Sequence, residues 1–163
     1  MSLNRISAEI PPQGGILVGS SIFPRSRPYR ILWVDDSRSL LSLYKAVFES
    51  LGFEVVATPS PQEALNRLPW EQADVAILDY DMPEMDGGTL ASMIKSRFPG
   101  MPVILYTGST KVPRRTRCSV DAICAKTAPR GELLAVVERL LCKSANRHSE
   151  PRQPGLSPQS ATA

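Results

Sequence analysis

The chain has 163 residues and a formal net charge of +3, with 42% hydrophobic and 21% charged residues. This length allows one ordinary domain with its own hydrophobic core, and it leaves no room for a second. No apolar run approaches the roughly 18–20 residues of a membrane-spanning helix, and Pro11-Pro12 and Gly14-Gly15 interrupt any signal peptide. The charge alone does not indicate nucleic-acid binding. We therefore expect a single soluble domain with no membrane association.

The cysteines and the histidine limit the available chemistry. Cys118, Cys124 and Cys142 have no metal-ligand spacing, which is typical of reduced thiols in a cytoplasmic protein. Cys124 lies in an apolar run and is predicted to be a small core residue. The only histidine, His148, lies in a polar segment. Phosphohistidine transfer and histidine-ligated metal sites are therefore not expected, so the chemistry must come from carboxylates, hydroxyls and lysine.

Composition divides the chain into three parts. Residues 1–28 are rich in proline, glycine and serine, and we expect a flexible leader. Residues 143–163 are polar and rich in proline and serine, and we expect a disordered tail. Residues 29–142 remain as one compact domain.

Within this domain, apolar runs alternate with helical periodicity. After the first run, apolar residues recur at helical spacing from Leu40 to Leu51, and Gly52 should end that helix. Ser60 and Glu63 form a capping box that begins a second helix. The predicted strands are 30–34, 54–57, 75–78, 103–106 and 122–125, and the predicted helices are 40–51, 60–68, 90–97 and 133–141.

The predicted strands are apolar throughout, and helices separate them along the chain. Such strands form a parallel sheet that helices cover on both faces. We therefore predict an α/β fold built on a doubly wound, five-stranded parallel sheet.

Residues with reactive or metal-binding side chains follow four of these strands. Asp35 and Asp36 follow the first strand, Asp79 the third, Thr107 the fourth and Lys126 the fifth. Ligands bind beyond the carboxyl ends of the strands in such folds, so we expect these side chains to converge. Three carboxylates repel one another unless a cation joins them, and Mg²⁺ prefers such oxygen ligands. A carboxylate can also attack phosphorus, while a lysine and a hydroxyl stabilise the phosphoryl oxygens.

Each of these residues also has a simpler interpretation. The acidic pair could only cap the helix that begins near Ser37, Thr107-Gly108 could be a turn, and Lys126 could be a solvated charge. Their joint occurrence at successive strand ends favours a site that accepts a phosphoryl group on Asp79.

Three segments of the chain resemble the receiver domain of bacterial response regulators, the phosphoacceptor part of two-component systems. Residues 79–87 fit the family signature D-x-x-M-P-x-M-D-G at every fixed position. Residues 31–37 fit the strand with the acidic pair, and residues 105–108 fit the strand that ends in a switch hydroxyl. The resemblance covers about 29–142 and implies a flavodoxin-like, receiver-type fold.

The resemblance also implies roles for individual residues. Asp79 would be the phosphorylated residue and a ligand of the cofactor Mg²⁺, which Asp36 would bind directly and Asp35 through water. The backbone carbonyl of Asp81 would be a further metal ligand. Thr107 and Lys126 would hold phosphoryl oxygens, Thr107 would move to transmit the signal, and the small Gly108 would keep the space above Asp79 open.

By the same resemblance, the phosphoryl donor would be a sensor histidine kinase or a histidine phosphotransfer protein. The chain would be no enzyme beyond its own phosphorylation and dephosphorylation. Nothing after Leu141 resembles an output domain. We therefore expect a stand-alone cytoplasmic bacterial receiver that contacts a downstream protein target and does not bind nucleic acid directly.

The sequence departs from the family pattern in three places. Ile123 occupies the position of an aromatic switch residue, and Thr127 replaces the proline that normally follows the lysine through a cis bond. The stretch between Thr107 and Lys126 is short and contains Pro113, so the fourth helix should be stunted. These departures affect the coupling of phosphorylation to output.

Three alternatives stay open at this stage. A degenerate receiver would bind proteins without phosphorylation, as Ile123 and the altered fourth helix would suggest. A phosphatase of the haloacid-dehalogenase type also uses a D-x-D nucleophile motif, although the order of its acidic residues differs. Finally, a basic stretch could be a solvated loop or a docking surface for an acidic partner; it consists of Lys111, Arg114, Arg115 and Arg117.

Overall fold

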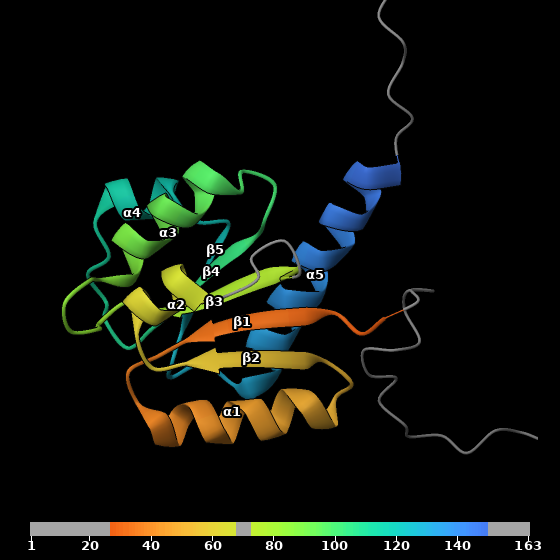
Figure 1. Ribbon diagram of the computed structural model, residues 1–163, viewed down its shortest axis with the longest axis horizontal. Helices are drawn as coiled ribbons and strands as arrows, with labels where there is room; N and C mark the ends of the chain where they lie inside the picture. Colours follow the sequence, from red (N-terminus) through yellow and green to blue (C-terminus); the bar gives the residue numbers. More distant parts are fainter. Residues whose placement is uncertain (1–26, 68–72, 150–163) are drawn as a thin grey trace, which may run out of the picture.

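A computed structural model describes residues 27–67 and 73–149, which form a central sheet flanked by helices (Figure 1). The five strands pair in parallel in the order β2-β1-β3-β4-β5. The strands are β1 (Arg30–Val34), β2 (Glu54–Thr58), β3 (Val75–Asp79), β4 (Val103–Thr107) and β5 (Ala122–Ala125). The helices are α1 (Arg38–Ser50), α2 (Pro61–Arg67), α3 (Gly87–Arg97), α4 (Arg114–Cys118) and α5 (Arg130–Ser149). The predicted doubly wound parallel sheet is therefore confirmed.

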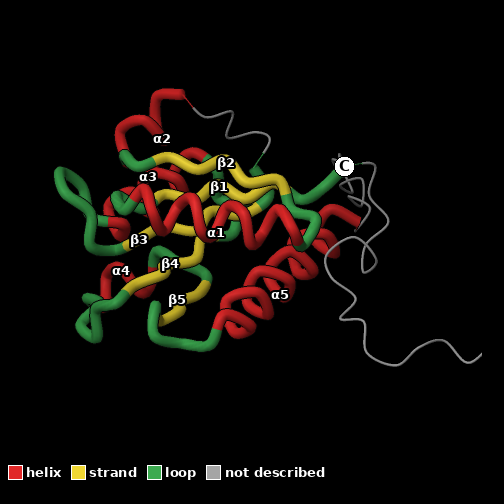
Figure 2. Tube along the Cα trace, turned by 90° about the horizontal axis from the view of Figure 1, so that it is seen from below, coloured by secondary structure: helices red, strands yellow, loops and turns green. Residues whose placement is uncertain are grey.

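The helices divide between the two faces of the sheet. Helices α1 and α5 cover one face, and α2, α3 and α4 cover the other (Figures 1 and 2). Strands β1 and β3 lie between two other strands and are almost wholly buried, which explains why they are apolar on both sides. No helix among the described residues is both long and apolar enough to cross a bilayer.

Side chains along each strand point alternately to the two faces of the sheet, so each face has its own hydrophobic core. In β1, Ile31 and Trp33 enter the core beneath α1 and α5, whereas Leu32 and Val34 enter the core beneath α2 and α3. The first core is rich in aromatic rings, with Trp33 stacked on Tyr44 of α1 at a centroid distance of 4.8 Å. Cys124 belongs to the same core and is 1% exposed, which confirms its predicted burial.

Local signals set the helix ends. The Ser37 hydroxyl accepts a hydrogen bond from the Leu40 N–H at the start of α1. At the other end of α1, Gly52 has φ 86°, a left-handed conformation that glycine adopts without steric cost. Asp86 caps α3 by accepting from the N–H groups of Gly88 and Thr89.

The segment that leads into β1 is fixed at the end of the sheet where β1 and β3 begin. The Arg27 guanidinium donates to both carboxylate oxygens of Asp74, at 2.8 and 3.2 Å. Asp74 immediately precedes β3 and also accepts from the backbone N–H of Arg30 at 2.8 Å. Two segments that are distant in sequence are therefore joined at the amino ends of β1 and β3.

The structure differs from the sequence-based predictions at the ends of several helices and segments. Helix α5 extends to Ser149, so the predicted disordered tail at 143–163 is wrong for residues 143–149, which contain no proline or glycine to stop a helix. Helix α3 begins at Gly87 instead of residue 90, because the Asp86 cap precedes the apolar pattern. The predicted leader at 1–28 lies outside the described residues except for its last two, and 150–163 also lie outside them.

Candidate phosphoacceptor site

Asp35, Asp79 and Lys126 lie on the same face of the sheet, because side chains along each strand point alternately to its two faces. Asp79 ends β3, and Asp35 and Lys126 follow β1 and β5 by one residue. Each is two residues beyond a side chain of the aromatic core, so each continues that side of its strand. Thr107 ends β4 on the other side. Because the strands are parallel, all four residues lie at the same edge, which we call the carboxyl edge.

Lys126 joins two of the carboxylates. Its Nζ lies 2.9 Å from Oδ2 of Asp35 and 2.9 Å from Oδ2 of Asp79. The two carboxylates are 1% and 4% exposed, so water screens these ion pairs only weakly. Burial lowers the pKa of Lys126, but the hydrogen bonds and charges of Asp35 and Asp79 outweigh it and raise that pKa above its usual value. The ammonium group therefore stays charged.

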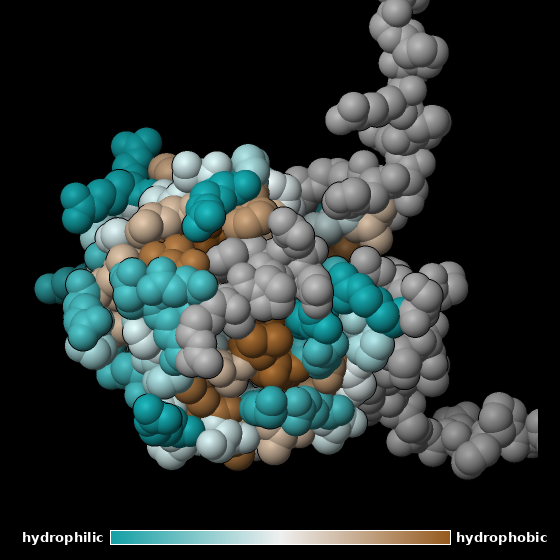
Figure 3. Space-filling model, viewed as in Figure 1, coloured by the Kyte–Doolittle hydropathy of each residue, from teal (hydrophilic) through white to brown (hydrophobic). Residues whose placement is uncertain are grey.

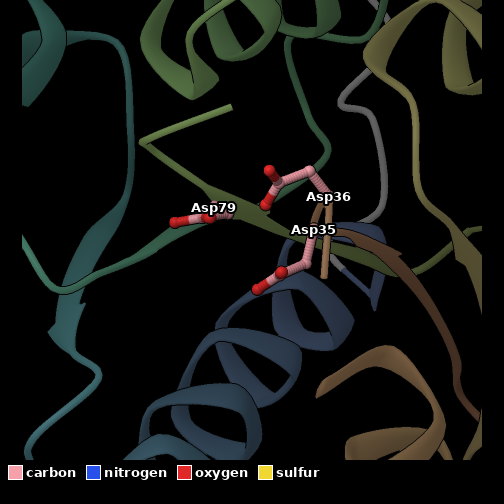
Figure 4. A group of neighbouring side chains, drawn as sticks. All are labelled: Asp35, Asp36 and Asp79. Carbon is pink, nitrogen blue, oxygen red and sulfur yellow. The ribbon is translucent and has the colours of Figure 1, made fainter. Parts of the chain in front are cut away.

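Asp35, Asp36 and Asp79 form an acidic cluster at the ends of β1 and β3 (Figure 4). Each offers a carboxylate oxygen, and these oxygens lie within 4.8 Å of one another. Asp35 is fixed by the Ser37 N–H, which donates to its Oδ1 at 2.9 Å. Asp36 is exposed and makes no recorded bond among the described residues. The cluster therefore has two buried carboxylates that bind Lys126 and one that faces solvent.

This donor set fits a divalent cation. Three carboxylates and one ammonium leave an excess negative charge that a hard dication would neutralise. Mg²⁺ prefers oxygen ligands and keeps several waters, and the exposure of Asp36 to solvent is compatible with such waters.

Thr107 connects the site to the segment that follows β4. Its Oγ1 donates to Oδ2 of Asp81 at 3.4 Å and accepts from the Ser109 N–H at 2.9 Å. The backbone N–H of Lys126 donates to the Thr107 carbonyl at 2.8 Å, which fixes Lys126 beside β4. A change in the bonding of the Thr107 hydroxyl would therefore act directly on residue 109.

The loop between β3 and α3 passes very close to Asp79. The Gly87 N–H donates to the Tyr80 carbonyl at 3.1 Å, and a Cβ on Gly87 would come within 2.0 Å of the Asp79 carbonyl oxygen. Only glycine permits this approach. Gly108 is different, because a Cβ there would meet no atom within 4 Å, so packing does not require that glycine.

The predicted departures are visible in the structure. Ile123 is 36% exposed on β5, and α4 is a five-residue helix that begins directly after Pro113. The described residues contain no cis peptide bond, so the Lys126–Thr127 bond is trans.

The sequence prediction missed two polar contacts near the site. Ser109 was not identified, although a serine two residues after a strand-ending threonine is a common turn signal. The second contact joins the hydroxyls of Tyr44 and Tyr106 at 2.6 Å. Tyr106 directly precedes Thr107, but no local pattern reveals a partner 62 residues away.

A doubly wound sheet whose carboxyl edge combines an acidic cluster, a lysine and a hydroxyl is typical of signalling domains that accept a phosphoryl group on aspartate. The model of the response regulator receiver domain matches residues 31–138. The chain therefore belongs to the response regulator receiver domain family, and its function is that of a phosphoacceptor signalling module.

Similar proteins carry this domain within longer chains. The transcriptional regulatory protein GlrR of Escherichia coli (strain K12) is 34% identical over 122 residues, which are 73% of this chain and 28% of that protein. The protein-glutamate methylesterase/protein-glutamine glutaminase 2 of Rhodospirillum rubrum is 38% identical over 92 residues, which are 55% of this chain and 25% of that protein. The chain thus spans about a quarter of the length of these relatives.

A solved structure extends the comparison to the fold. The response regulator protein TrrA from Thermotoga maritima, solved in complex with Mg²⁺-BeF, has a TM-score of 0.65 and 27% sequence identity. The match covers 69% of this chain and 98% of that one. The two chains share the same receiver fold.

Proposed function

We propose that Asp79 is the phosphoryl acceptor of this chain and that Mg²⁺ is its cofactor. The observation that carries the proposal is the position of Asp79, which belongs to the acidic cluster and also binds Lys126 at 2.9 Å. A carboxylate oxygen of Asp79 attacks the phosphorus, and the phosphorus–nitrogen bond of a donor phosphohistidine breaks. The histidine nitrogen keeps the electron pair and takes a proton.

The surrounding residues have complementary roles in this proposal. Asp36, Asp79 and the backbone carbonyl of Asp81 would hold Mg²⁺, and Asp35 would hold it through water. The metal supplies charge neutralisation at the phosphoryl oxygens. Lys126 holds a further phosphoryl oxygen, and the Thr107 hydroxyl turns from Asp81 towards the phosphoryl group.

The partners follow from this chemistry. The phosphoryl donor is a sensor histidine kinase or a histidine phosphotransfer protein, and a downstream protein reads the phosphorylated state. The family and the free cysteines support a bacterial cytoplasmic setting. No finding favours a haloacid-dehalogenase-type phosphatase or a degenerate binding module.

The test is phosphorylation by acetyl phosphate with Mg²⁺, measured by intact mass. We expect the gain of one phosphoryl group in the native chain and none in Asp79→Asn. Glu84→Gln is a matched control, because Glu84 is an exposed carboxylate in the loop after β3. It should be phosphorylated like the native chain. Equal phosphorylation of Asp79→Asn, or none of the native chain, would refute the proposal.

Metal binding can be measured separately. Titration with Mg²⁺, followed by Trp33 fluorescence with Trp70 replaced by phenylalanine in every variant, should give an affinity about tenfold weaker for Asp36→Asn than for Glu84→Gln, because one charged ligand is lost. Trp33 lies two residues before Asp35 and is buried, so its emission can report changes in the acidic cluster. Equal affinities would exclude Asp36 as a ligand.

A further inference from the structure

One residue of β4 lies beside the proposed phosphoryl acceptor and is bound to a helix through its hydroxyl. Tyr106 is the register partner of Asp79 in the β3–β4 pair, and both side chains point to the face that α1 and α5 cover. Neighbouring strands lie about 4.8 Å apart, so the base of the Tyr106 side chain stands next to that of Asp79. Tyr106 is 3% exposed. It is therefore a buried neighbour of the acidic cluster.

The hydroxyl partner of Tyr106 is Tyr44, on the inner side of α1. Their hydroxyl oxygens lie 2.6 Å apart, and their ring centroids lie 5.5 Å apart with the ring planes at 87°. Tyr44 is in turn stacked on Trp33 of β1, with the two ring planes only 14° apart. Because this stacking fixes the Tyr44 ring, its hydroxyl can hold Tyr106 in a defined position. We call Tyr44 and Tyr106 the tyrosine pair.

Helix α1 is connected to the carboxyl edge at two points. Hydrophilic side chains are prominent over α1 at the bottom of the view in Figure 3, where the helix faces solvent. On its inner side, the Ser37 N–H at the start of α1 donates to Asp35 at 2.9 Å, and the tyrosine pair joins α1 to β4 about two turns later. Strand β3 separates β1 from β4 in the sheet. The tyrosine pair therefore links the two sides of the site across Asp79.

The end of β4 determines where the groups that bind the phosphoryl oxygens lie. Thr107 directly follows Tyr106, and its carbonyl accepts from the Lys126 N–H at 2.8 Å. The Lys126 ammonium group lies 2.9 Å from both Asp35 and Asp79. A displacement of the β4 end would therefore move the Thr107 hydroxyl and Lys126 relative to the acidic cluster. Small displacements of this kind slow reactions that depend on the orientation of several groups.

We propose that the tyrosine pair positions the carboxyl edge for phosphoryl transfer, by setting the separation between the end of β4 and the α1–β1 side of the site. This inference rests on the proposed function. Both tyrosines are positioning residues, because their hydroxyls bind each other and act on the reacting atoms through Thr107 and Lys126. The acidic cluster itself follows β1 and β3. Loss of the pair should therefore slow the transfer and leave the Mg²⁺ affinity unchanged.

The test compares the native chain with Tyr44→Phe, Tyr106→Phe and the double variant. Every chain carries Trp70→Phe, so that Trp33 is the only tryptophan and its fluorescence reports Mg²⁺ binding. Phosphorylation by acetyl phosphate at saturating Mg²⁺ is followed by intact mass, at a temperature at which all the chains are folded. Phe53→Leu is the matched control, because Phe53 is buried in the same core but lies at the amino end of β2.

We expect each single variant to be phosphorylated about fivefold more slowly than the native chain. The double variant should be no slower than the single variants, because the second change removes nothing once the bond is lost. The Mg²⁺ affinity of all these chains should agree within about twofold. Phe53→Leu should keep the native rate, because a modest loss of stability leaves nearly all of the chain folded.

A second measurement does not depend on phosphorylation. Amide hydrogen exchange, followed by NMR, reports local opening of the structure. The Lys126 N–H donates to the Thr107 carbonyl at the carboxyl edge, whereas the Glu54 N–H donates to the Tyr29 carbonyl at the other end of the sheet. In Tyr44→Phe and Tyr106→Phe, exchange at Lys126 should become severalfold faster relative to exchange at Glu54. A general loss of stability would accelerate both.

Several results would overturn the proposal. Native phosphorylation rates in both single variants would do so, and so would an equal slowing in Phe53→Leu or additive effects of the two tyrosine changes. A loss of Mg²⁺ affinity that accounts for the slower rate would assign the pair to support of the metal site instead. If acetyl phosphate modifies none of the chains, the proposed function fails. The ratio of exchange at Lys126 to exchange at Glu54 then still decides, and an unchanged ratio would exclude positioning of the carboxyl edge.

Discussion

The two faces of the sheet are packed by different side chains. The core beneath α1 and α5 contains five buried aromatic residues, whereas the buried members of the core beneath α2 and α3 are aliphatic residues and methionines. The aromatic residues are Tyr29, Trp33, Phe48, Phe53 and Tyr106. Rings have few rotatable bonds and contact one another in fixed geometries, and methionine adapts to irregular spaces. We infer that the aromatic face resists deformation more than the aliphatic face.

The residues of the proposed phosphoacceptor site divide between the same two faces. Asp35, Asp79 and Lys126 continue the aromatic side of their strands, and Thr107 continues the aliphatic side. The residues that bind the phosphoryl group and metal in our proposal therefore stand on the stiffer core. Thr107, the residue that moves in the same proposal, stands on the softer one, next to the short α4.

Truncation of paired residues in β1 tests this comparison most directly. Trp33→Ala should lower the free energy of unfolding by about 3–5 kcal/mol, since it creates a large cavity. Leu32→Ala, on the opposite face, should cost at least about 1 kcal/mol less, because it removes no ring–ring contact. Urea denaturation of both variants measures the difference. Equal losses would show that the aromatic contacts add nothing.

Gly87→Ala tests the tight passage beside Asp79 on the aliphatic side. The new Cβ would meet the Asp79 carbonyl oxygen, which belongs to a central strand and cannot easily shift. We expect a loss of about 1–3 kcal/mol in the free energy of unfolding and slower phosphorylation by acetyl phosphate. Gly108→Ala is the control, since its Cβ would meet open space. Similar losses in both variants would contradict the steric argument.

The hydroxyl pair of Tyr44 and Tyr106 sharpens the comparison on the aromatic side. Either Tyr→Phe change should cost about 1 kcal/mol, because it removes the hydrogen bond between the two hydroxyls. The double variant should cost less than the sum of the two single variants. A double-mutant cycle of unfolding free energies measures this coupling. Strict additivity would show that the 2.6 Å contact does not stabilise the protein.

Asp86 tests the entry to α3 on the aliphatic side. Asp86→Ala should cost about 1 kcal/mol, because the cap of α3 is lost. Burial raises the pKa of Asp86, but hydrogen bonds from Thr89 and Gly88 and the charge of Arg115 lower it overall. This stabilisation is present above the unfolded pKa of about 3.9 and disappears as the pH falls through the lower folded value. The native chain should therefore lose stability relative to Asp86→Asn below about pH 4, as measured by thermal unfolding, and a constant difference would contradict this.

The smallest expected effect concerns Glu84, in the loop that leads to α3. Glu84 has φ 69°, a left-handed conformation that asparagine adopts more readily than glutamate. Glu84→Asn should raise the free energy of unfolding by about 0.5 kcal/mol. Phosphorylation should not change, because Glu84 is exposed and lies outside the acidic cluster. A loss of stability would show that the Glu84 side chain has a role of its own.

Much of the fold could be predicted from the sequence, because its strands are buried on both faces. The apolar runs at β3 and β4 identified both strands to within one residue. Parallel strands bring their ends to one edge, so the convergence of Asp35, Asp79 and Lys126 followed directly. The start of α3 was misplaced because Gly87 and Gly88 lack apolar periodicity.

The remaining features depend on tertiary contacts. The sequence identified Lys126, but only the structure shows that it binds Asp35 and Asp79 at equal distances. The Tyr44–Tyr106 contact joins α1 to β4, and its formation depends on the spacing between helix and sheet. The extension of α5 to Ser149 was missed because polar composition indicates exposure and does not exclude a helix.

The ion pair between Arg27 and Asp74 decides where a protein fused ahead of residue 27 would emerge. The pair holds Arg27 at the amino ends of β1 and β3, and Asp79 lies at the far ends of the same parallel strands. A fluorescent reporter joined there would start a full strand length away from the acidic cluster. Such a fusion would leave the approach of a phosphoryl donor unobstructed, whereas an insertion at Ser109 would sit directly beside it.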